Sequence, residues 1–161
     1  MTSSFNEMNL QPQLMQAVLD CGYETPTPIQ SKVIPVMLTG QDVLGQAKTG
    51  TGKTAAFALP ILNNLNPNQN HIQALVMTPT RELAMQVANS FNLYGKIQGT
   101  RILAVYGGQP YSPQITRLKK GVDIVVGTPG RMLDLIDRKV LNLNQVNTVV
   151  LDEADEMLSM G

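Results

Sequence analysis

The chain has 161 residues, of which 43% are hydrophobic and 15% are charged, and its formal net charge at pH 7 is zero. This length is enough for one domain with a buried core, and the composition excludes a disordered chain. The balanced charge counts against a nucleic-acid binder that depends on a basic surface. Backbone N–H groups and a few arginines could still contact phosphates.

The single cysteine, Cys21, excludes an internal disulfide, which favours the cytoplasm. It closes an apolar helical face, so we expect it to be buried as a small hydrophobic residue. No apolar run reaches the length of a membrane-spanning helix, and the start of the chain lacks the apolar core of a signal peptide. The sequence therefore predicts a cytoplasmic protein without a membrane segment.

Helical spacing predicts a first helix over Leu10–Cys21, capped by Asn9, and a second from about Ile29 to Leu38. Glycine and proline between Gly22 and Pro28 separate the two. Strands and helices then alternate. The expected strands are Asp42–Leu44, Ala74–Met77, Ile102–Tyr106, Asp123–Val126 and Thr148–Leu151. The expected helices follow Gly52 and Thr80, cover Ser112–Lys120, and follow Pro129 and Asp152.

This alternation predicts an α/β fold with a parallel sheet and right-handed crossovers. We expect residues 1–40 to form a helical segment that packs on a main domain of residues 41–161.

A glycine-rich run between the first expected strand and the third expected helix is typical of a phosphate-binding loop. It consists of Ala47, Lys48, Thr49, Gly50, Thr51, Gly52, Lys53 and Thr54. Its backbone N–H groups would face a polyphosphate, Lys53 would reach the β- and γ-phosphates, and the Thr54 hydroxyl would ligate Mg²⁺. Ala47 stands where the general pattern has glycine, and a solvated turn is the alternative for the run read alone.

An acidic pair follows the last expected strand, Thr148–Leu151, which we expect to be buried. Carboxylates at the end of a parallel strand are placed to hold the Mg²⁺ of a bound nucleotide. Asp152 would hold the metal through water, and Glu153 would orient and deprotonate the attacking water. The alternative is an ordinary acidic helix start, which the phosphate-binding loop makes less favourable.

Further short motifs occur in a fixed order along the chain. They are Gly22–Gln30 before the loop, Pro79–Ala84, Gly107–Gly108, Thr128–Arg131, and Asp152-Glu153-Ala154-Asp155. Together with the loop, this set resembles the amino-terminal RecA-like domain of the DEAD-box RNA helicases, from Phe5 to the end of the chain. Each motif alone is weak, but the set in register is specific. The family also has alanine at the position of Ala47.

The resemblance implies that the chain binds ATP and Mg²⁺, with residues 1–40 containing the adenine-reading motif. Tyr23 would stack on the base, and the backbone near Thr25 would assist. The Gln30 amide can donate and accept hydrogen bonds at once, which suits the N6 amine and N7 of adenine. Phe5 corresponds to an isolated aromatic of the family and is given a supporting role.

The resemblance also assigns RNA contacts to the residues that follow three of the strands. They are Pro79, Thr80, Arg81, Glu82, Gly107, Gly108, Thr128, Pro129, Gly130 and Arg131. Helix N-termini and glycine turns present N–H groups to phosphates, so binding should not depend on base sequence. Contact with the 2′-OH would favour RNA over DNA. The alternative is that these segments are only turns between strands and helices.

Relatives in this family continue with a strand that ends in Ser-Ala-Thr, which does not occur here. The resemblance places that strand beside the acidic-motif strand, so we expect a gap in the sheet. It also implies a second RecA-like domain that carries an arginine finger. The parent would be an ATP-dependent RNA helicase, and this part alone would be inactive.

The alternative for the isolated part is a non-catalytic adenine-nucleotide and RNA-binding module. A further alternative is a DNA-directed helicase or a small-molecule kinase with the same loop. The kinase is disfavoured, because kinases lack the Tyr23–Gln30 segment and the Thr128–Arg131 motif.

Overall fold

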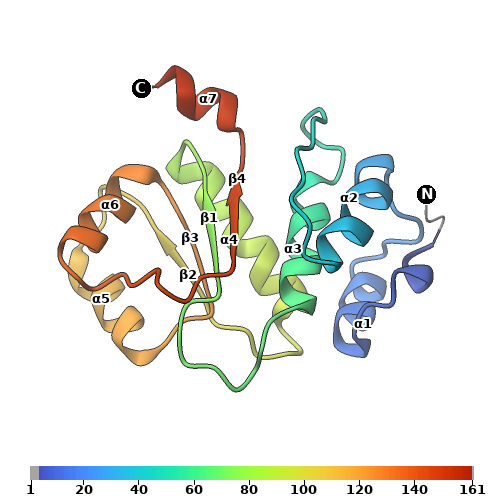
Figure 1. Ribbon diagram of the computed structural model, residues 1–161, viewed down its shortest axis with the longest axis horizontal. Helices are drawn as coiled ribbons and strands as arrows, with labels where there is room; N and C mark the ends of the chain where they lie inside the picture. The colour runs from blue at the N-terminus through green and yellow to red at the C-terminus, as the bar shows by residue number, and fades with distance from the viewer. Residues whose placement is uncertain (1–3, 161) are drawn as a thin grey trace. The chain divides into compact units, whose positions relative to one another are not determined.

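The structure, a computed structural model, describes residues 4–160 (Figure 1). A short 3-10 helix, η1, covers Phe5–Met8. The α-helices of the described residues are α1 (Pro12–Asp20), α2 (Pro28–Leu38), α3 (Lys53–Asn63), α4 (Arg81–Gly95), α5 (Tyr111–Lys120), α6 (Pro129–Asp137) and α7 (Ala154–Ser159). The strands are β1 (Ala74–Met77), β2 (Ile102–Val105), β3 (Ile124–Gly127) and β4 (Thr148–Leu151). No helix among these residues is long and apolar enough to span a membrane.

The chain packs as two compact units, each with its own set of elements. The first contains residues 4–65 and 90–100, and so includes η1, α1, α2 and α3 with the end of α4. The second contains residues 66–89 and 101–160, and so includes the whole sheet. The alternation of strands and helices predicted from the sequence is confirmed, as is the α/β class.

All four strands run parallel in the order β2-β3-β1-β4. Their last residues lie in one row, because Met77 pairs with Gly127 and with Leu151, and Val105 pairs with Gly127. The segments that follow the strands therefore all leave the sheet at the same edge. In a parallel α/β sheet this carboxyl edge is where ligands bind.

Helices α5 and α6 cover one face of the sheet through an apolar cluster. Its buried members are Ile72, Leu75, Leu103, Val105, Val122, Val125, Met132, Leu135 and Leu141. Strand residues that point to the other face, such as Val76, Ile124 and Val126, are also fully buried. Strands buried on both faces are expected to be nearly continuous in hydrophobic residues, which is the pattern of β1 and β3.

Helices α1 and α2 begin at prolines, which suit the first position of a helix. The predicted cap of α1 by Asn9 is wrong: Gln11 precedes the helix without a side-chain capping bond, and Asn9 ends η1 at a φ of 57°. Helix α2 has a full capping box, in which Thr27 and Gln30 bond to each other's backbone N–H groups. Cys21 is half-buried, not fully buried as expected.

Two predictions for the sheet are corrected. Residues 42–44 form no strand, and the Leu44 side chain is 94% exposed. The acidic-motif strand β4 was expected to be buried, but Val149 and Leu151 are 58% and 56% exposed. Within residues 4–160, β4 pairs only with β1, and no strand pairs with residues 42–44. Apolar residues at these positions therefore lack the neighbouring backbone that would bury them.

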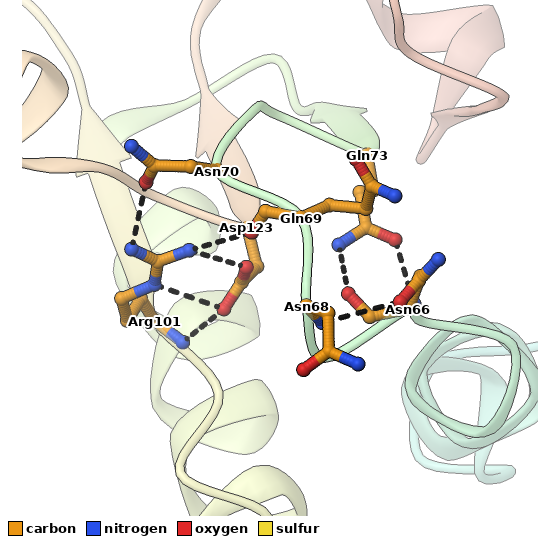
Figure 2. A network of polar contacts seen from close by, with 7 residues as sticks. All are labelled: Asn66, Asn68, Gln69, Asn70, Gln73, Arg101 and Asp123. Atoms are coloured by element: carbon orange, nitrogen blue, oxygen red, sulfur yellow. Dashed lines mark hydrogen bonds and ion pairs between the residues drawn. The ribbon is translucent and has the colours of Figure 1, made fainter.

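A polar network fixes the opposite, amino-terminal edge of the sheet (Figure 2). Asp123 accepts hydrogen bonds from the Arg101 backbone N at 2.8 Å and from Arg101 Nη2 at 2.9 Å. Arg101 Nη1 donates to Asn70 Oδ1 at 3.2 Å. The Gln73 amide bonds to both backbone groups of Asn66, at 2.8 and 2.9 Å. The polar loop before β1 is thereby tied to β2 and β3.

Candidate nucleotide and nucleic-acid sites

The predicted phosphate-binding loop leads directly into α3, whose first residue is Lys53. Gly50 and Gly52 have φ angles of 83° and 86°, in the left-handed region that favours glycine. The Thr51 hydroxyl donates to the Lys48 carbonyl and closes the loop. Ala47 and residues 51–54 are half-buried, and residues 48–50 are exposed. The loop thus presents an accessible backbone at a helix N-terminus, where an anion is favoured.

The loop is attached to the predicted adenine-reading motif through Gln30. This residue is 5% exposed, and its Nε2 donates to the Gly52 carbonyl at 3.2 Å. Its Oε1 accepts from the Thr27 backbone N at 3.0 Å. A Cβ on Gly52 would lie 2.4 Å from Gln30 Nε2, so a larger residue there would displace the Gln30 amide. The amide keeps one N–H and one lone pair for another partner.

Tyr23 lies in the segment between α1 and α2 and is half-buried. Its hydroxyl oxygen is 3.0 Å from that of Tyr94 near the end of α4. The two ring centroids are 6.2 Å apart, in an edge-on arrangement. Thr25 is exposed, whereas Phe5 is buried in the core and acts there as a packing residue. Tyr94 was not identified from the sequence, because a tyrosine within a helix carries no motif signal.

The RNA-contact motifs predicted after β1 and β2 lie next to each other at the carboxyl edge. The Arg81 guanidinium is 5.7 Å from the ring centroid of Tyr106. A Cβ on Gly108 would lie 3.5 Å from Arg81 Nη1. The Thr80 hydroxyl accepts from the Leu83 backbone N at 3.2 Å, as expected for the start of α4.

Exposure differs among the residues of these two motifs. Gly107, Gly108, Arg81 and Glu82 are exposed, whereas Pro79 is buried. The exposed glycine turn can present backbone N–H groups, while the proline serves packing.

The motif after β3 is connected to the glycine turn by Arg131, which is buried. Its Nη1 donates to the Gln109 carbonyl at 2.9 Å and to Gln114 Oε1 at 3.1 Å. Its guanidinium also lies 4.0 Å from the ring centroid of Tyr111. The charge of Arg131 is thus used inside the protein. The exposed member of this motif is Gly130, next to the half-buried Thr128 and Pro129.

Gly127, the last residue of β3, supports this edge and was missed by the sequence analysis. A Cβ there would lie 2.2 Å from the Val105 carbonyl oxygen and 2.5 Å from Val105 Cγ2. Only glycine allows β2 to pass this close. A glycine that ends an apolar strand immediately before Thr128 is the sequence signal that could have identified it.

The acidic motif leaves the same edge after β4. The Asp152 backbone N donates to the Met77 carbonyl at 2.9 Å, and Asp152 and Glu153 are half-buried. Glu153 has a φ of 54°, which is uncommon for a residue with a side chain and often marks functional sites. The pKa of the Glu156 carboxyl is raised. The largest cause is a hydrogen bond with Glu153, followed by desolvation and the charges of Glu153 and Asp155.

No group of three or more His, Cys, Asp or Glu side chains within residues 4–160 is arranged to hold a metal ion. Mg²⁺ does not require such a group, since it commonly keeps its waters and binds one or two carboxylates together with substrate phosphates. Thr54 and Asp152 are oxygen donors of the kind that suits Mg²⁺.

A sequence model of the family described as "DEAD/DEAH box helicase" matches residues 27–161. The chain is 57% identical over 159 residues to "ATP-dependent RNA helicase DeaD" of Haemophilus influenzae, covering 98% of this chain and 26% of that protein. It is 52% identical over 161 residues to "DEAD-box ATP-dependent RNA helicase CshA" of Bacillus subtilis, covering 100% and 33%. The chain therefore spans about a quarter to a third of the length of these curated relatives.

The solved structures that this chain resembles are also described as a DEAD box protein and an RNA helicase. A DEAD box protein from Methanococcus jannaschii superposes with a TM-score of 0.95 at 48% identity, covering 99% of this chain and 44% of that one. A hypothetical ATP-dependent RNA helicase from Sulfolobus tokodaii gives a TM-score of 0.87 at 45% identity, covering 94% and 44%. The expected RecA-like fold is thereby confirmed.

Proposed function

Because the chain belongs to the DEAD/DEAH box helicase family, we propose that it supplies the ATP-binding and RNA-contacting part of an ATP-dependent RNA helicase. The parent protein would separate short RNA duplexes locally. The observation that carries this proposal is the loop of residues 47–54, held by Gln30 at the start of α3. It joins an anion-binding helix end to a buried amide that can recognise a base.

In the nucleotide site, the loop backbone and Lys53 hold the triphosphate, and Mg²⁺ neutralises part of the phosphate charge when bound. Thr54 and Asp152 are the residues that would hold the metal. Tyr23 stacks on adenine, with the backbone near Thr25 alongside. The free N–H and lone pair of the Gln30 amide match the N7 and N6 amine of adenine, whereas guanine offers a carbonyl at the amine's position.

Glu153 is the general base for hydrolysis. Its carboxylate takes a proton from a water molecule as the water oxygen attacks the γ-phosphorus. The bond from that phosphorus to the β–γ bridging oxygen breaks, and ADP and phosphate leave. The left-handed backbone of Glu153 aims its side chain differently from an ordinary first residue of a helix. No role in hydrolysis is assigned to Asp155.

RNA binds at the carboxyl edge of the sheet through its sugar–phosphate backbone, independently of base sequence. Gly107, Gly108 and Gly130 contribute accessible backbone, and Arg81 contributes an exposed charge. Arg131 acts indirectly, since its hydrogen bond to Gln109 holds the glycine turn near α6. A second RecA-like domain of the parent supplies the other half of the site, and the protein works in the cytoplasm.

The test is ATP hydrolysis by the intact protein with and without RNA, together with separation of a short labelled duplex. We expect RNA to stimulate hydrolysis, and duplex separation to require ATP. A protein that binds ATP and RNA without turnover would instead support the non-catalytic binding module. Stimulation by DNA equal to that by RNA would contradict the role of the 2′-OH and favour a DNA-directed helicase.

A further inference from the structure

Tyr94 is a buried side chain that contacts the base motif from outside it. It is the next-to-last residue of α4 and is 4% exposed. Its hydroxyl oxygen lies 3.0 Å from the hydroxyl oxygen of Tyr23, and the two rings meet edge-on. The contact spans 71 residues of sequence, so it is formed only by the tertiary structure.

The end of α4 is itself held against α3, the helix that begins with Lys53. The Phe91 ring is fully buried, with its centroid 6.1 Å from that of Phe57 in α3. A Cβ on Gly95 would lie 3.1 Å from Leu62 Cδ2, also in α3. Tyr94 lies between these two contacts in sequence. Its hydroxyl is therefore a fixed point relative to α3.

We propose that Tyr94 is a positioning residue for the nucleotide base: its hydroxyl holds the Tyr23 ring in the orientation that stacks on adenine. The inference rests on the proposed function, in which Tyr23 is the stacking residue. Tyr23 lies in an irregular segment and is only half-buried, so fewer packing contacts hold its ring than hold a fully buried one. Fixing the ring before binding removes an ordering cost that would otherwise weaken affinity.

The hydroxyl groups of Tyr23 and Tyr94 differ in whether another hydrogen-bond partner is available to them. Tyr23 is half-buried, so its hydroxyl can turn to water if its partner is removed. Burial, followed by the hydrogen bond to Tyr23, raises the pKa of Tyr94, so that it remains a neutral donor and acceptor. Tyr94→Phe keeps the buried ring and removes only the hydroxyl that holds Tyr23. Tyr23→Phe breaks the same bond from the other side and leaves the buried Tyr94 hydroxyl unpaired.

The experiment measures the affinities of the intact protein for ATP and for inorganic tripolyphosphate, which has no base, by calorimetry with Mg²⁺ present. We expect Tyr94→Phe to weaken ATP binding about fivefold, as for the loss of one hydrogen bond, and to leave tripolyphosphate binding unchanged. In a Tyr23→Phe background, Tyr94→Phe should cause no further loss. Tyr111→Phe, the same chemical change in the second unit, should leave the affinities for ATP and for tripolyphosphate unchanged.

Equal ATP affinities of the wild type and Tyr94→Phe would overturn the inference while leaving the proposed function intact. An equal loss for ATP and tripolyphosphate would also overturn it, because a general disturbance of α3 would then be the cause. A wild type that binds ATP no better than tripolyphosphate would overturn base recognition itself, and with it this inference. Thermal unfolding of each variant checks that the comparison is made between folded proteins.

Discussion

Gly52 combines two separate requirements for glycine. Its φ of 86° is unfavourable for a residue with a Cβ, and its missing Cβ leaves room for the Gln30 amide. Gly50 has nearly the same φ, 83°, but nothing lies within 4 Å of the position of its Cβ. At Gly50 only the backbone conformation favours glycine, whereas at Gly52 the backbone conformation and a close contact both do.

Gly52→Ala should consequently destabilise the protein more than Gly50→Ala. Both variants carry the cost of a left-handed residue, about 1–2 kcal/mol, but only Gly52→Ala displaces the Gln30 side chain from Thr27 and the loop. Chemical denaturation of both variants measures the difference. Equal losses of unfolding free energy would show that Gln30 moves aside without cost.

Glu153→Gln should retain ATP and RNA binding but slow hydrolysis by about 10²–10⁴-fold, because the amide keeps the shape and cannot take the proton of water. Single-turnover hydrolysis with saturating RNA is the measurement. Asp137→Asn, which removes an exposed carboxylate at the end of α6, is the control and should hydrolyse ATP at close to the normal rate. Normal hydrolysis by Glu153→Gln would remove Glu153 from the proposed mechanism.

Among the elements, the carboxyl and amino edges of the sheet carry different kinds of residues. The motifs that follow β1, β2, β3 and β4 all lie at the carboxyl edge. The amino edge is closed by the network around Arg101 and Asp123, whose side chains form an ion pair of 2.9 Å (Figure 2). Glycine is favoured at position 121 beside it by a φ of 115°, and a Cβ there would displace the Arg101 guanidinium, whose Nη1 it would approach to 2.5 Å. None of the candidate site residues belongs to this network of described residues.

Asp123→Ala should lower the free energy of unfolding by about 2–4 kcal/mol, because it removes the acceptor of the Arg101 backbone N–H and the carboxylate that pairs with the Arg101 guanidinium. Urea denaturation at neutral pH is the measurement. Asp42→Ala removes an exposed carboxylate from an irregular segment and should change the stability by less than about 0.5 kcal/mol. A similar small effect of Asp123→Ala would mean that water replaces the carboxylate at this edge.

For the molecule as a whole, the described residues leave one side of β4 without a neighbouring strand. Val149 and Leu151 are exposed there, and Leu44 is exposed in the segment that was expected to be a strand. An apolar, unpaired strand edge favours pairing with another chain. The curated relatives are three to four times longer than the part matched, so their remaining sequence can supply such a strand.

Residues 1–161 alone should therefore self-associate at high concentration, and Val149→Lys should reduce this association, because an edge lysine opposes strand pairing. Size-exclusion chromatography over a range of concentrations is the measurement. Leu133→Lys replaces a similarly exposed residue on α6 and should leave the association unchanged. Equal elution of the wild type and Val149→Lys at all concentrations would exclude the β4 edge as the contact.

Local patterns in the sequence were sufficient to predict most of the helices and strands. Strands β1 and β4 have the predicted bounds, and β2 and β3 differ by one residue at their ends. Helix starts were predictable where proline or a glycine loop marks them, as in α2, α3 and α6. Asp42–Leu44 was not predictable in this way, because a short apolar run becomes a strand only when another strand pairs with it.

The sequence by itself determined the family, the order of elements and the identity of the motif residues, because each of these is encoded over a few neighbouring positions. Only the tertiary structure decided how those residues are used. It buried Arg131 and bonded it to Gln109, attached Gln30 to Gly52, and placed Tyr94 against Tyr23. These contacts join residues 22 to 71 positions apart. They depend on how helices and strands pack, and no local pattern of residues records that.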